Sequence, residues 1–252
     1  MKPYIKHLFA FIAALSLSTL PAFSQSKAAA DEAYAKERFH DALSIYQQLL
    51  PKGESADVYY NLANCYYRLD SIAPAILWYE RALMLSPGDG DIRFNLRLAR
   101  SKTIDKILPE EELFFVRWYR SLLNTMSVGG WQILTLCLFA AMLVAFGCFF
   151  LSDAVRLRKL GFYGGFALLL LVLMGNVMVW QQKQNLREHT RAILMQQAVT
   201  VKSTPSDNGT DLFLLHSGTS MQILDNSMPE WYQIRLSDGK EGWIPAKTVE
   251  VI

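Results

Sequence analysis

The sequence is poor in the residues that build catalytic and metal centres. It contains 3 cysteines and 4 histidines among 252 residues, and none of them has the spacing of a metal site or of a nucleophilic pair. Cys137 and Cys148 lie inside one apolar run, so the cysteines do not suggest a disulfide framework. Glycine-rich phosphate loops and the Gly-x-Ser-x-Gly and His-Glu-x-x-His motifs are missing. We therefore expect a non-catalytic protein with no cofactor and no metal.

Charge is nearly balanced overall and missing from two long runs. The 25 basic and 23 acidic residues leave a net charge of +2, so we expect no nucleic-acid partner. Residues 131–151 and 160–180 contain no charged side chain, and each has about the 20 apolar residues that cross a bilayer as a helix. The alternative, two core helices of a soluble domain, would require other segments to cover two fully apolar cylinders. The sequence thus predicts transmembrane helices at 130–151 and 160–181, joined as a hairpin.

The N-terminus, residues 1–24, has the features of a secretory signal peptide. Lys2 and Lys6 precede the apolar stretch 8–20, and small residues precede a predicted cut after Ser24. No cysteine follows the cut, so a lipoprotein anchor is not expected. Cleaved or not, such a segment sends the following residues out of the cytoplasm.

The orientation of the hairpin follows from this signal. Two spans return the chain to the side it left, so the regions before and after the hairpin should both lie outside the cytoplasm. The turn, residues 152–159, should be cytoplasmic. Its Arg156, Arg158 and Lys159 agree with the positive-inside rule.

Between the signal and the first span, the chain repeats itself at helical-repeat spacing. The signature positions of a tetratricopeptide repeat are occupied by Tyr59, Leu62, Ala63, Tyr66, Ala75, Tyr79, Ala82 and Pro87. A less complete repeat precedes it at residues 27–51, and the pattern of Tyr60-Asn61-Leu62 returns as Phe94-Asn95-Leu96. We predict an all-α domain at residues 25–108 with two repeats and a capping helix. So short a stack is marginal, and something else should cover an open end.

An amphipathic helix is predicted at 109–129, directly before the first span. Its apolar residues, among them Phe114, Phe115 and Trp118, alternate with Arg117 and Arg120 at helical spacing. It fits a juxtamembrane helix lying on the outer leaflet, or a segment that covers the open end of the repeat stack.

After a polar stalk at 182–191, the pattern changes from helical to alternating. Short alternating segments separated by turn residues predict a small all-β barrel over residues 192–252. The best hairpin signal is the sequence Ser-Asp-Gly-Lys at 237–240. The candidate strands are 198–202, 219–224, 231–236 and 241–244. With Trp231-Tyr232 and Gly242-Trp243-Ile244-Pro245, this region resembles a bacterial SH3 domain.

Candidate binding residues follow from both folds. In tetratricopeptide stacks the first helices line the concave face, which predicts a groove formed by Tyr60, Asn61, Asn64, Tyr67, Arg68 and Asn95. Asn61 occupies one position of the carboxylate clamp with which some tetratricopeptide proteins bind a partner's C-terminus. Asp31, Asp91 and Asn95 stand where that clamp has asparagine, lysine and arginine, so we expect the partner to bind through an extended segment or a helix rather than through a C-terminal carboxylate. The resemblance to SH3 domains implies a second groove with Trp231, Tyr232 and Pro245. All these aromatic residues could instead serve packing.

The order of parts resembles BatE, a bacterial family related to aerotolerance. The most characteristic stretch is the repeat at residues 59–69 with 75–83 and 91–96. The resemblance implies a multi-pass protein of the bacterial cytoplasmic membrane with both terminal domains outside. It also implies an assembly with von Willebrand factor A-domain membrane proteins and a MoxR-type AAA ATPase.

Two functions fit these features. The first is a membrane-anchored scaffold that binds partner proteins outside the cytoplasm. The alternative is a cell-envelope binding or sensor protein whose SH3 domain binds peptidoglycan or a peptide.

Overall fold

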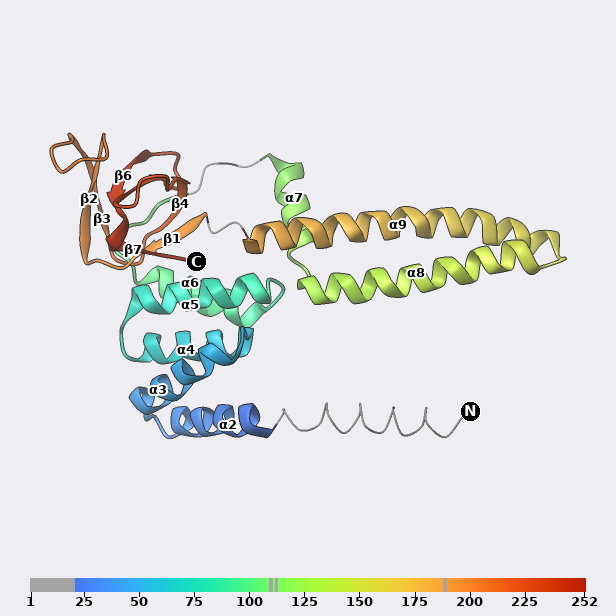
Figure 1. Ribbon diagram of the computed structural model, residues 1–252, viewed down its shortest axis with the longest axis horizontal. Coiled ribbons are helices and arrows are strands. Elements are labelled where there is room, and N and C mark those ends of the chain that lie inside the picture. The colour runs from blue at the N-terminus through green and yellow to red at the C-terminus, as the bar shows by residue number, and fades with distance from the viewer. Residues whose placement is uncertain (1–20, 109–110, 112, 188–189) are drawn as a thin grey trace. The chain divides into compact units, whose positions relative to one another are not determined.

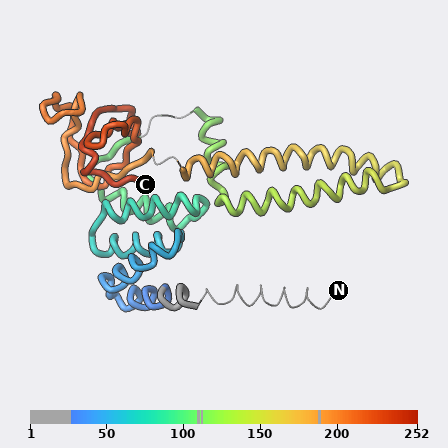
Figure 2. The backbone as a smooth tube through the Cα atoms, in the orientation of Figure 1, coloured from blue at the N-terminus to red at the C-terminus, as the bar shows by residue number. Residues whose placement is uncertain are grey.

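The computed structural model describes residues 21–108, 111, 113–187 and 190–252 (Figure 1). Residues 1–20 of the predicted signal peptide, which spans 1–24, therefore lie outside the described residues. The chain forms two compact units: one joins the described residues through Ala82 with Gly90–Ile107 and Arg191–Ile252, and the other contains Leu83–Asp89 and the stretch from Leu108 to Thr190. Figure 2 follows the backbone through both.

Among the described residues, the α-helices lie before residue 188 and the strands follow. The helices are α2 (Pro21–Ala35), α3 (Phe39–Leu49), α4 (Ala56–Arg68), α5 (Ile72–Leu85), α6 (Gly90–Ser101), α7 (Phe114–Leu123), α8 (Val128–Leu151) and α9 (Val155–Arg187). The strands are β1 (Arg191–Leu194), β2 (Ala198–Lys202), β3 (Asp211–His216), β4 (Ser220–Asp225), β5 (Trp231–Arg235), β6 (Glu241–Pro245) and β7 (Val249–Val251). The all-α region, the two long apolar helices and the C-terminal antiparallel sheet confirm the predicted fold class.

The helix pairs α2/α3 and α4/α5 turn in the same way. Glu37 and Asp70, at the two turns, both adopt a left-handed backbone, with φ of 59° and 56°. In each turn the next amide donates to a carbonyl five residues back, from Arg38 to Ala33 at 3.0 Å and from Ser71 to Tyr66 at 2.9 Å. This is a Schellman-type helix end. The repetition of one turn geometry supports a first repeat at α2/α3.

The repeat helices share a core built on small and aromatic residues. Ala30, Ala42 and Cys65 are fully buried where helices cross closely, and Tyr46 fills the space between them. Ser55 caps the N-terminus of α4, and its hydroxyl accepts a hydrogen bond from the backbone amide of Val58 at 3.5 Å.

The C-terminal strands form one antiparallel sheet in the order β3-β2-β6-β5-β4-β1-β7. Its core includes Val201, Ile234 and Ile244, all fully buried. The predicted turn at 237–240 joins β5 to β6, with Gly239 at a φ of +83°. Three strands were not predicted: β1, β3 and β7.

In the other unit, α8 and α9 pack closely against each other. Both are long and apolar enough to span a membrane. Gly161 lets the two backbones approach closely, since a Cβ atom there would lie 2.5 Å from the carbonyl oxygen of Ala145. At the other end of the pair, Leu123 of α7 packs with Trp131 and Met178.

The ends of the hairpin differ from expectation. The turn is shorter than 152–159, because α9 begins at Val155 and includes Arg156, Arg158 and Lys159. The polar segment expected as a stalk continues α9 to Arg187, because it holds good helix formers and no glycine or proline.

Candidate protein interaction site

The predicted groove residues of α4 and α6 are tied together by hydrogen bonds. The amide nitrogen of Asn95 donates to the hydroxyl of Tyr60 at 2.7 Å and to Oδ1 of Asn64 at 3.5 Å. The Tyr79 hydroxyl donates to the same Asn64 oxygen at 2.5 Å. Tyr60, Asn64 and Asn95 are partly buried, so they form an ordered polar floor.

A second cluster joins the first and second repeats. Asn61 donates to Oδ1 of Asp31 at 3.2 Å, and the hydroxyl of Tyr46 donates to the same oxygen. Lys27 forms an ion pair with this carboxylate at 3.1 Å. Asp31 thus engages Asn61 within the chain.

The remaining groove residues carry cations and aromatic rings. Lys102 Nζ lies 4.4 Å from the centre of the Tyr67 ring, and the Arg68 guanidinium lies 5.2 Å from that of Phe39. Arg68 is the exposed member of the predicted groove, and Tyr67 is half-buried. The surface therefore combines an exposed guanidinium with aromatic rings that already lie against cations of the chain.

Burial keeps one thiol and two tyrosine hydroxyls of the stack in their neutral forms. Desolvation raises the pKa of the Cys65 thiol to about 12, so it stays protonated and unreactive at neutral pH. Desolvation, with the bond to Asp31, also raises the pKa of Tyr46, and desolvation raises that of Tyr79. Both hydroxyls therefore remain hydrogen-bond donors.

The predicted SH3 groove is divided between two faces of the sheet. Residues opposite each other in an antiparallel pair share a face, and Trp231 lies opposite Pro245 whereas Tyr232 lies opposite the buried Ile244. Tyr232 packs against the core of the sheet. Trp231 and Pro245 are half-buried on the opposite face, so the structure brings these two together and separates Tyr232 from them.

Trp243 joins Trp231 and Pro245 on this outer face. Trp243 lies between the buried residues Gly242 and Ile244 in β6. Because successive side chains of a strand alternate between faces, Trp243 points away from the core. The sequence favoured a packing role for Trp243. The alternation of strand 241–244 was the signal that could have placed it with the binding candidates.

A junction between the repeats and the sheet was not predicted, and Glu80 of α5 is its buried centre. Its side chain is 3% exposed. Arg100 of α6 donates to one carboxylate oxygen, and Arg191 of β1 donates to the other at 3.3 Å. Two half-exposed arginines, one from each fold, therefore neutralise one buried acid.

Asp105, in the segment after α6, makes a second set of bonds. It accepts the backbone amide of His216 at 2.7 Å and the Thr219 hydroxyl at 2.7 Å, and it lies 2.8 Å from Nδ1 of His216. Desolvation acts to raise the pKa of this carboxyl, but the bonds from His216 and Thr219 outweigh it and hold the pKa below its usual range.

Close packing completes the junction. A Cβ atom at Gly218, in the β3–β4 turn, would lie 2.8 Å from Cγ2 of Thr103 and 3.2 Å from Cδ1 of Ile76. Arg81 donates to the carbonyl oxygen of Val251 at 2.7 Å. The sheet thus covers α5 and α6, the part of the stack where a further repeat would continue.

Comparison with known families supports both folds. Residues 56–89 match the tetratricopeptide repeat, and residues 197–250 match the bacterial SH3 domain. No curated protein matches the chain. These are interaction folds, and neither indicates an enzyme family. Within the described residues, no group of three histidine, cysteine, aspartate or glutamate side chains could hold a metal ion.

Proposed function

We propose that this protein is a non-catalytic scaffold, anchored by the α8–α9 hairpin, that binds partner proteins on the extracytoplasmic side of a bacterial cytoplasmic membrane. The observation that carries the proposal is the junction at Glu80, Asp105 and Gly218. Two interaction folds that flank the hairpin in sequence meet in one unit. Contact between them requires both to lie on one side, which two spans provide.

The partner surface is the concave face of the repeats. Tyr60, Asn64 and Asn95 form its floor, and Tyr67 and Arg68 supply a half-buried aromatic ring and an exposed cation. This surface suits an extended segment or a helix of a partner. The resemblance to BatE makes von Willebrand factor A-domain membrane proteins, with a MoxR-type ATPase system, the partners we propose.

Affinity purification from mildly solubilised native membranes tests this function. Full-length protein should recover such partners well above an untagged control, and the triple substitution of Asn61, Tyr67 and Arg68 by alanine should reduce recovery about tenfold or more. The matched control replaces three exposed residues of α3, Asp41, Ser44 and Gln48, and should recover partners normally. Unchanged recovery by the groove variant would remove the groove assignment.

A second candidate function is favoured by the outer face of the sheet. Trp231, Trp243 and Pro245 form a half-buried apolar surface of the kind that binds a glycan strand or a peptide. Full-length protein should co-sediment with purified peptidoglycan, and Trp231→Ala with Trp243→Ala should abolish this. Sedimentation that is absent, or unaffected by the two substitutions, would exclude the function.

A further inference from the structure

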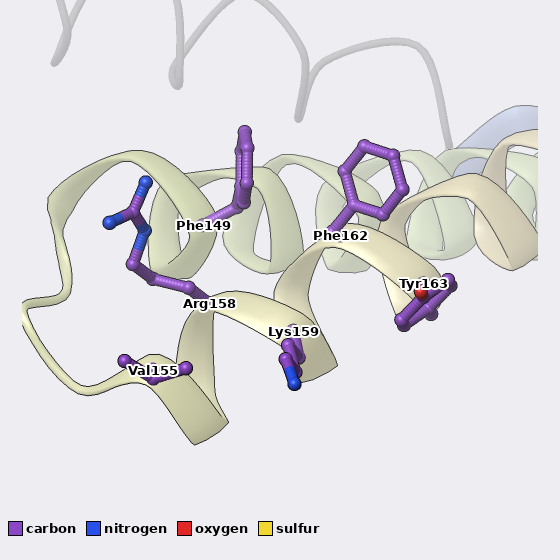
Figure 3. Close-up of a pocket in the computed structure, with 6 residues that line it drawn as sticks. All are labelled: Phe149, Val155, Arg158, Lys159, Phe162 and Tyr163. Carbon is purple, nitrogen blue, oxygen red and sulfur yellow. The ribbon is translucent and has the colours of Figure 1, made fainter.

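A cavity of about 250 Å³ lies where α8 meets α9. Its wall combines two cations with three aromatic rings (Figure 3). The lining residues are Phe149 from α8 and Val155, Arg158, Lys159, Phe162 and Tyr163 from α9. Figure 3 shows Arg158 extending toward α8, where Phe149 lies, whereas Lys159, the next residue of α9, extends away from α8, with Tyr163 on the following turn.

Among the described residues, the two cations have no anionic partner. In the part of the chain that the structure describes, neither Arg158 nor Lys159 forms an ion pair, and the cavity wall contains no carboxylate. The guanidinium of Arg158 lies 5.9 Å from the centre of the Phe149 ring, a weak cation–π contact that leaves its N–H groups available. The site therefore carries two uncompensated positive charges.

The rest of the wall is apolar and continues into the hairpin. The Phe149 and Phe162 rings lie 5.4 Å apart, and Phe162 lies 5.4 Å from Tyr163. Val155 and Tyr163 are mostly exposed. Cations at the end of an apolar span, beside exposed apolar and tyrosine side chains, are placed at headgroup depth.

We propose that this cavity binds the headgroup phosphate of an anionic phospholipid. Arg158 and Lys159 would donate to the phosphate oxygens, while Phe149 and Phe162 would contact the first carbons of the acyl chains. The inference rests on the proposed membrane hairpin. An acidic protein segment is the less favoured occupant, because most of the wall is apolar.

The test uses full-length protein reconstituted into nanodiscs that contain phosphatidylglycerol and phosphatidylcholine in equal amounts. Native mass spectrometry then counts the lipids that each protein retains. Wild-type protein should retain phosphatidylglycerol in preference to phosphatidylcholine. Arg158→Gln with Lys159→Gln should reduce this preference about tenfold, whereas Arg158→Lys with Lys159→Arg should keep it.

Arg156→Gln is the matched control, because Arg156 lies on the same turn but does not line the cavity. An equal loss in this control would indicate diffuse surface charge and overturn the site, as would full retention by the double glutamine variant. Displacement of the lipid by millimolar inorganic phosphate would indicate a free-anion site instead. Normal insertion of the variants, with normal partner recovery, would separate failure of this site from failure of the proposed function.

Discussion

Single side chains link the two interaction folds. Glu80 is the clearest case, because a carboxylate that is 3% exposed is costly to bury unless cations and hydrogen bonds compensate it. Arg100 comes from the same helical region, but Arg191 is 111 residues away in sequence. A local sequence pattern therefore could not predict the ion pair between Glu80 and Arg191.

Acid should weaken the junction through Asp105. Its folded pKa is lower than its unfolded pKa, so its contribution to stability is complete above the ordinary value of 3.8 and is lost as the pH falls through the folded pKa. Hydrogen exchange of the His216 amide, corrected for intrinsic rate, should therefore accelerate below pH 4. Asp105→Asn should accelerate it already at pH 6 and remove most of the acid dependence.

Asp238→Asn is the control for this measurement. Its pKa is also lowered, chiefly by Lys240, but it lies in the β5–β6 turn. The Asp238→Asn substitution should leave the hydrogen exchange rate of the His216 amide unchanged. Equal effects of the two substitutions would show that the acid response belongs to the sheet alone.

Alanine substitutions at two glycines with nearly the same backbone conformation distinguish the effect of strain in a turn from the effect of a disrupted junction. Gly218 and Gly239 have φ of +88° and +83°, so alanine is strained at both by about 1–2 kcal/mol. At Gly218 the new methyl group would also meet Thr103 and Ile76, whereas Gly239 lies in the β5–β6 turn. Gly218→Ala should therefore expose α5 and β1 to hydrogen exchange, whereas Gly239→Ala should weaken only the sheet. The same α5 exchange in both variants would contradict a packed junction.

Helix packing in the hairpin depends on small residues at defined positions. A Cβ atom at Gly161 would lie 2.5 Å from the Ala145 carbonyl oxygen and 2.8 Å from the Phe149 amide nitrogen, whereas one at Gly164 would meet nothing within 4 Å. Gly161→Ala should lower the melting temperature in detergent by several degrees, and Gly164→Ala should not. Equal melting temperatures would mean that α8 and α9 pack differently.

The elements that repeat or alternate were predictable, and those set by distant contacts were not. The strand at 198–202 and the turn at 237–240 were predicted because alternation and turn chemistry are local. β3 contains the unbroken apolar run Leu-Phe-Leu-Leu and β7 has three residues, so neither shows a period. Likewise the repeat positions placed Tyr60, Asn64 and Asn95 on one predicted surface, and the alternation of 241–244 could have placed Trp243 on the face of Trp231.

Taken together, these contacts give the protein a simple architecture. The repeats and the SH3 domain lie at opposite ends of the sequence but belong to one unit, and the hairpin and α7 interrupt the chain between them. We propose that a protein built in this way presents one binding unit on one side of a membrane. The proposed orientation follows from the predicted signal peptide and from the cations near the turn.

Labelling of single cysteines with a membrane-impermeant maleimide tests this architecture most directly. Cysteine replaces Ser44, Asp153 or Lys240 in a protein whose own three cysteines are alanine. Positions 44 and 240 should be labelled in spheroplasts, and position 153 only after the membrane is opened. Labelling of 44 and 240 from opposite sides, or of 153 alone in intact spheroplasts, would contradict the account.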